Sequence, residues 1–86
     1  MTPDERVLSA PTILTVAGLD FTVHAGGQHI VVYRIDARNR RHEYHLWPST
    51  GRWRHKHPSS GWGIEAQPFL NGVRDLVRYM QEVLDN

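Results

Sequence analysis

The spacing of apolar side chains along this chain changes between its first two thirds and its end. From residue 12 to residue 64, apolar and polar positions alternate in short runs separated by turn sequences, a pattern typical of half-buried β-strands. From residue 68 to residue 85, apolar residues return every three or four positions, which is helical spacing. We therefore predict an α+β fold in which a C-terminal helix packs across one face of an antiparallel sheet.

The sheet is expected to contain about five strands. The expected strands are the segments 12–17, 19–24, 29–36, 41–47 and 52–57. Residues 62–64 are either a short sixth strand or part of the crossover to the helix over 68–85. Residues 1–10 show neither pattern and are expected to be a flexible lead-in to a single domain spanning 1–86.

The register between the third and fourth expected strands decides which of their side chains face the core. We expect Asp36 to pair with Arg41, which places Tyr33 opposite Tyr44 in an apolar row. These side chains are then expected to lie beneath the C-terminal helix.

A second hairpin follows the same logic. Pairing Trp47 with Arg52 across a four-residue turn places Leu46 opposite Trp53 on the core side. The alternative pairs the two tryptophans and gathers histidines with Glu43 on one face. That register places basic side chains opposite core residues, so we prefer the first.

The face opposite the core is expected to be basic and aromatic. Residues 34–57 hold seven of the ten Lys and Arg residues, four of the six histidines and two of the three tryptophans. Guanidinium groups bind phosphate with paired donors, and indoles stack on bases. The expected ligand-binding residues are Arg34, His45, Trp47, Arg52, Arg54 and Lys56.

Beside them Ile30, Val32 and Trp47 are expected to form an apolar patch, which predicts a partner interface or a homodimer.

Composition narrows the classes of protein that fit. The net charge is only +1, so the basic character is local and argues against avid, nonspecific binding of duplex DNA. The absence of cysteine excludes disulfides and thiolate metal sites. No apolar run approaches the length of a membrane span, and the polar N-terminus does not resemble a signal peptide. We expect a cytoplasmic protein without a cofactor.

Candidate chemistry is limited to the histidines. His55 and His57 have the spacing that some metal sites on β-strands use, but no third ligand can be placed, so we predict no metal site. Glu43 and His45, with arginines nearby, have the residue types of a small metal-free ribonuclease. Their spacing is generic, and we assign no catalytic residue.

The turn from Trp47 to Trp53 (WPSTGRW), followed by Gly72-Val73 near the start of the helix, resembles small uncharacterised phage or mobile-element proteins with a W-P-S-T-G-x-W turn. The resemblance implies no specific activity. Many small phage proteins bind host machinery, including defence systems, so the resemblance does imply a second hypothesis, an inhibitor that binds a host protein.

The leading hypothesis is a non-enzymatic protein that binds a nucleic acid or a nucleotide. The alternatives are a phage-derived inhibitor of the anti-defence or anti-CRISPR type that binds an acidic host protein, and a ribonuclease-like enzyme.

Overall fold

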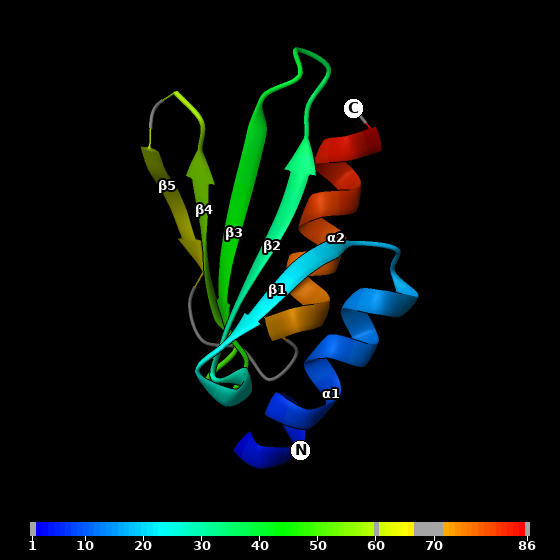
Figure 1. Ribbon diagram of the computed structural model, residues 1–86, viewed down its shortest axis with the longest axis vertical. Coiled ribbons are helices and arrows are strands. Elements are labelled where there is room, and N and C mark those ends of the chain that lie inside the picture. The colour runs from blue at the N-terminus through cyan, green and yellow to red at the C-terminus, as the bar shows by residue number, and fades with distance from the viewer. Residues whose placement is uncertain (1, 60, 67–71, 86) are drawn as a thin grey trace.

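In the computed structural model, which describes residues 2–59, 61–66 and 72–85, five strands form one antiparallel sheet and both helices cover the same face of it (Figure 1). The elements are α1 (Pro3–Val16), β1 (Asp20–His24), a short 3-10 turn (Ala25–Gly27), β2 (His29–Ile35), β3 (Arg41–Trp47), β4 (Arg52–His57), β5 (Gly61–Ala66) and α2 (Gly72–Asp85). The strands lie in the sheet in chain order. For 62–66 and 83–85 only the backbone is described. Of the helices described, none is long and apolar enough to cross a membrane.

The α+β class, the antiparallel sheet of five strands and the C-terminal helix against it are confirmed. One predicted strand is wrong, because residues 12–17 are not a strand. Of the two alternatives for residues 62–64, the strand is confirmed: they belong to β5, the last strand of the sheet. The predicted start of the C-terminal helix at residue 68 lies outside the described residues.

The predicted flexible lead-in over 1–10 is wrong, because most of it belongs to α1. The Thr2 hydroxyl accepts a hydrogen bond from the Glu5 backbone N–H at 3.2 Å, and Pro3 occupies the first turn, so the helix has an N-cap. Ala10 and Leu14 are fully buried against the sheet. This burial outweighs the β-propensity of the branched residues at 12–16.

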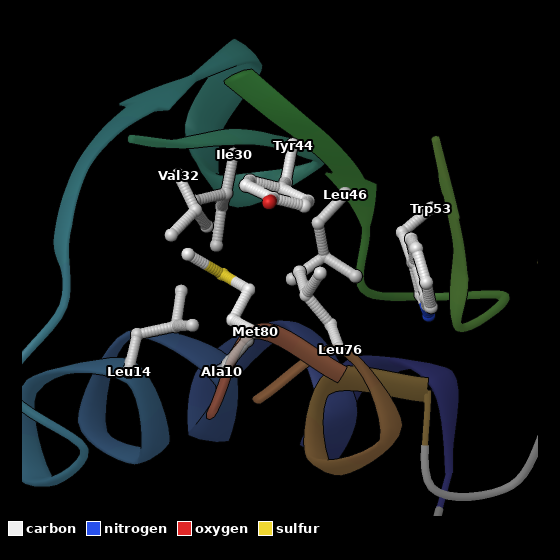
Figure 2. Packing of buried hydrophobic residues seen from close by; sticks show 9 residues of the cluster. All are labelled: Ala10, Leu14, Ile30, Val32, Tyr44, Leu46, Trp53, Leu76 and Met80. Atoms are coloured by element: carbon white, nitrogen blue, oxygen red, sulfur yellow. The ribbon is translucent and has the colours of Figure 1, made fainter. Parts of the chain in front are cut away.

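The core lies between the sheet and the two helices, as Figure 2 shows. Its buried apolar residues are Ala10 and Leu14 from α1, Ile30 and Val32 from β2, Tyr44 and Leu46 from β3, Trp53 from β4, and Leu76 and Met80 from α2. β2 and β3 each contribute alternate residues, as a sheet with one covered face requires.

The predicted register of β3 with β4 is confirmed: Leu46 pairs with Trp53, and Trp47 with Arg52. The turn between them is closed by the Gly51 N–H, which donates to the Trp47 carbonyl at 2.9 Å. Gly72 at the start of α2 packs directly on this turn, since a Cβ there would overlap the Cα and carbonyl oxygen of Gly51.

The predicted register of β2 with β3 is wrong by one residue. Ile35, not Asp36, pairs with Arg41. Asp36 instead begins the turn: its N–H donates to the Arg40 carbonyl at 2.9 Å, and its carboxylate accepts from the N–H groups of Arg38 and Arg40, each at 2.9 Å. This local hydrogen bonding fixes where the hairpin closes.

A shift of one residue moves every side chain of a strand to the other face. Ile30 and Val32 are therefore fully buried beneath the helices, and Tyr33 pairs with Glu43 on the opposite side. Trp47 alone of the predicted apolar patch remains on the uncovered face. The interface predicted from Ile30, Val32 and Trp47 is wrong, and the homodimer stays a prediction without that support.

The two tryptophans of the β3–β4 turn should differ sharply in their contribution to stability. Trp53→Ala should lower the free energy of unfolding by about 3–5 kcal/mol, because it removes a buried aromatic side chain from the core. Trp47→Ala, which truncates a half-buried indole on the uncovered face, is the matched control and should cost clearly less. Urea unfolding followed by circular dichroism measures both. Equal costs would contradict the assignment of the two faces.

Candidate functional site

The sheet face turned away from α1 and α2, the open face, carries the basic and aromatic side chains of the hairpins. The register that buries Leu46 and Trp53 places their neighbours in sequence on this side. Its residues in the central strands β2 to β4 are His29, Val31, Tyr33, Ile35, Arg41, Glu43, His45, Trp47, Arg52, Arg54 and Lys56.

A cavity of about 410 Å³ opens at the β3–β4 turn. The described residues that line it are Trp47, Ser49, Thr50, Arg52 and Arg54. The Arg6 guanidinium of α1 donates to the Ser49 carbonyl at 3.1 Å, which ties the turn to the first helix. The structure thus brings three of the predicted ligand-binding residues, an indole and two guanidinium groups, to one hollow.

The other three predicted ligand-binding residues are divided between the faces. His45 and Lys56 lie on the open face, where the register pairs His45 with Arg54. Arg34 does not join them. The shifted register of β2 turns it to the helix-covered side, where its Nε donates to the Tyr44 hydroxyl at 2.6 Å.

His29 also belongs to the open face, although it is not among the residues predicted to bind a ligand. Its ring stacks on Trp47, with the ring centroids 5.2 Å apart and the planes 9° from parallel. Its Nε2 lies 2.9 Å from Nδ1 of His45, whose Nε2 lies 3.1 Å from Oε1 of Glu43. A carboxylate can only accept, so His45 donates to Glu43 and accepts from His29. Burial, then the neighbouring His45 and His24, lower the pKa of His29.

This chain from Glu43 through His45 to His29 bears on the ribonuclease hypothesis. The Glu43–His45 contact that the hypothesis needs is present. Arg34, expected beside it as a phosphate clamp, lies on the other face of the sheet. The hypothesis therefore stays an untested prediction. The contacts of this chain hold the His29 ring against the Trp47 indole.

A second polar chain is buried on the helix-covered side. His42 and His55, which are 3% and 8% exposed, join through Nδ1 and Nε2 at 2.8 Å. His42 Nε2 lies 2.9 Å from the Asp36 carboxylate, and His55 Nδ1 lies 3.3 Å from the Tyr79 hydroxyl of α2. One direction satisfies every link: Tyr79 donates to His55, His55 to His42, and His42 to Asp36.

Burial and hydrogen bonding within this chain lower the pKa values of two of its members, Asp36 and His55. The His42 ring N–H and the backbone N–H of Arg40 hold the pKa of Asp36 well below its usual range. Burial lowers the pKa of His55 to about 4, and the nearby His42, Arg34 and His57 act in the same direction. His55 is therefore neutral at neutral pH, which the hydrogen-bond direction requires.

The weak metal candidates His55 and His57 are both engaged in hydrogen bonds. His55 uses its two nitrogens for His42 and Tyr79, and His57 Nδ1 accepts from the Ser59 N–H at 3.2 Å. Within the described part of the chain, no group of three or more His, Asp or Glu side chains is arranged to hold a metal ion.

Acid should destabilise the fold through His55. Its pKa is about 4 when folded and 6.5 as the ordinary value, so the unfolded chain binds the proton more readily. The contribution of His55 to the free energy of unfolding, on the order of 3 kcal/mol, is fully present above pH 6.5 and is lost as the pH falls toward 4. His55→Gln, which can still donate to His42 and accept from Tyr79, should flatten this pH dependence, although His29 contributes in the same direction. Melting temperatures from pH 7 to pH 4 measure it, and equal slopes in both proteins would contradict the assignment.

Metal removal should not affect the fold. We expect the melting temperature measured with excess EDTA to equal that of the untreated protein, because both ring nitrogens of His55 and Nδ1 of His57 are hydrogen-bonded to protein groups. A large drop that added zinc reverses would instead make His55 and His57 metal ligands.

Comparison of the chain with protein-family models, with curated proteins and with solved structures finds no match. The resemblance of the Trp47–Trp53 turn to small phage proteins, and the inhibitor hypothesis that follows from it, therefore stay untested predictions.

Proposed function

We propose that this protein binds a phosphate-bearing ligand, a nucleotide or a nucleic acid, in the cavity at the β3–β4 turn. The observation that carries the proposal is the lining of that cavity, in which Trp47, Arg52 and Arg54 meet at one hollow of about 410 Å³. Cavities of about 300–1,000 Å³ are typical of small-molecule sites.

Each lining group has a role that suits such a ligand. The Arg52 and Arg54 guanidinium groups offer paired N–H donors to phosphate oxygens. The Ser49 hydroxyl can donate to a phosphate or a sugar oxygen, whereas the Thr50 hydroxyl donates to the Trp47 carbonyl at 3.4 Å. The Trp47 indole offers a planar surface to a base, a contact worth about 1–3 kcal/mol. Because His29 stacks on Trp47, the indole is already oriented before a ligand arrives.

A second cavity provides a contrast within the same molecule. It has about 490 Å³ and lies between α1 and α2. Its described lining is Thr12, Ile13, Val16, Ala17, Arg74, Val77 and Gln81. Aliphatic side chains dominate this lining, and Arg74 is its one cation among the described residues. The cavity at the turn therefore fits an anionic, aromatic ligand better.

The proposal predicts that binding depends on the phosphate and on the indole. Calorimetric titration should show that thymidine monophosphate binds at least tenfold more tightly than uncharged thymidine. Trp47→Ala should weaken thymidine monophosphate by about 1–3 kcal/mol, and Arg52→Ala should weaken it and reduce the difference between the two ligands.

Arg74→Ala provides the matched control, because it removes an exposed arginine at the other cavity. It should leave the affinity unchanged. Equal affinity of thymidine and its monophosphate, or equal effects of Arg52→Ala and Arg74→Ala, would contradict the proposed site.

A further inference from the structure

We infer that the ligand is a single strand of nucleic acid that runs along β3 and β4 across the open face, with the cavity at the β3–β4 turn holding one of its nucleotides. This inference rests on the proposed function and extends it from a phosphate-bearing ligand to a polymer of defined path. It is carried by features of the open face that extend beyond the cavity.

The first feature is a row of cations on β4. Arg52, Arg54 and Lys56 occupy alternate positions, so all three side chains project from the open face. Alternate residues of a strand are spaced about 6.8 Å apart. The row therefore continues the positive charge of the cavity along the strand, as a chain of successive phosphates would require.

The second feature is a planar group at the far end of β3. The Arg41 guanidinium lies over the Tyr33 ring, 3.9 Å from its centroid. Guanidinium planes and aromatic rings are the groups on which single-stranded bases stack. Arg41 is exposed and Tyr33 is partly exposed, so this pair stands on the surface.

The separation of the two planar groups sets the size of the ligand. Arg41 and Trp47 are the first and last residues of β3, six positions apart, which corresponds to about 20 Å along the strand. A mononucleotide cannot reach both groups. A strand of several nucleotides can, with its phosphates beside the β4 cations and bases at both ends of β3.

The same features favour a single strand over a duplex. In a duplex the bases are stacked on one another, so they cannot stack on Trp47 or Arg41 without being unpaired. Sheet faces with aromatic residues are a common platform for unpaired bases. Glu43 is the one acid among the open-face residues of β2 to β4, and its Oε1 already accepts a hydrogen bond from His45 at 3.1 Å.

Binding measured by fluorescence anisotropy and calorimetry tests the inference. The probes are thymidine monophosphate, a thymidylate octamer, a uridylate octamer and a blunt hairpin duplex. We expect at least one octamer to bind tenfold or more tightly than thymidine monophosphate, and the duplex to bind more weakly than that octamer. For the octamer, the logarithm of the affinity should fall with the logarithm of salt concentration with a slope of about −2, because three cations contribute about −0.7 each.

Two arginine variants separate the inference from the proposed function. Arg41→Ala should weaken the octamer about fivefold and leave thymidine monophosphate unchanged, whereas Arg74→Ala should alter neither. Equal affinity for octamer and monophosphate, an octamer affinity insensitive to Arg41→Ala, or a duplex bound as tightly as the octamers would overturn the inference and leave the proposed function standing. Failure of the monophosphate and both octamers to bind would overturn both.

Discussion

The structure depends on the burial of one cross-strand pair, Leu46 of β3 and Trp53 of β4, beneath α1 and α2. Side chains alternate between the faces of a strand, so this burial leaves Trp47 and Arg52 only one direction to point. The hydrophobic effect that stabilises the core therefore also assembles the basic, aromatic surface on the other side. A substitution that reversed the pairing would lose both, which means that the core and the candidate site are products of the same constraint.

The β3–β4 turn joins that surface to the rest of the molecule. Arg6 of α1 donates to the Ser49 carbonyl, and Gly72 of α2 packs on Gly51, so both helices contact a turn of four residues. Loops that carry binding groups are usually mobile, and anchoring reduces the entropy lost when a ligand binds. Glycine is needed at position 72 because a larger side chain there would push α2 away from the turn, and at position 51 because its backbone has a φ of 77°, in the left-handed region.

The sequence was informative where the two faces of a strand differ and ambiguous where they do not. β3 and β4 alternate clearly, and their register was predicted correctly. β2 contains Ile30, Val31 and Val32 in succession, so its apolar pattern fits either register, and the hydrogen bonds of Asp36 in the following turn made the choice. α1 was missed because its β-branched residues suggested a strand, while the capping residue Thr2 was the available signal for a helix.

The site shows the same division. Trp47, Arg52 and Arg54 come from one hairpin, and correct pairing of that hairpin was sufficient to bring them together. The stack of His29 on Trp47 joins β2 to β3, and the buried chain from Asp36 to Tyr79 joins a turn to α2, so each needs a contact between distant parts of the sequence. The two chains of histidines have different roles. In the buried chain each ring N–H and the Tyr79 hydroxyl has an acceptor, and the chain connects α2 to the sheet. The chain on the open face instead holds the Trp47 indole where a ligand can reach it.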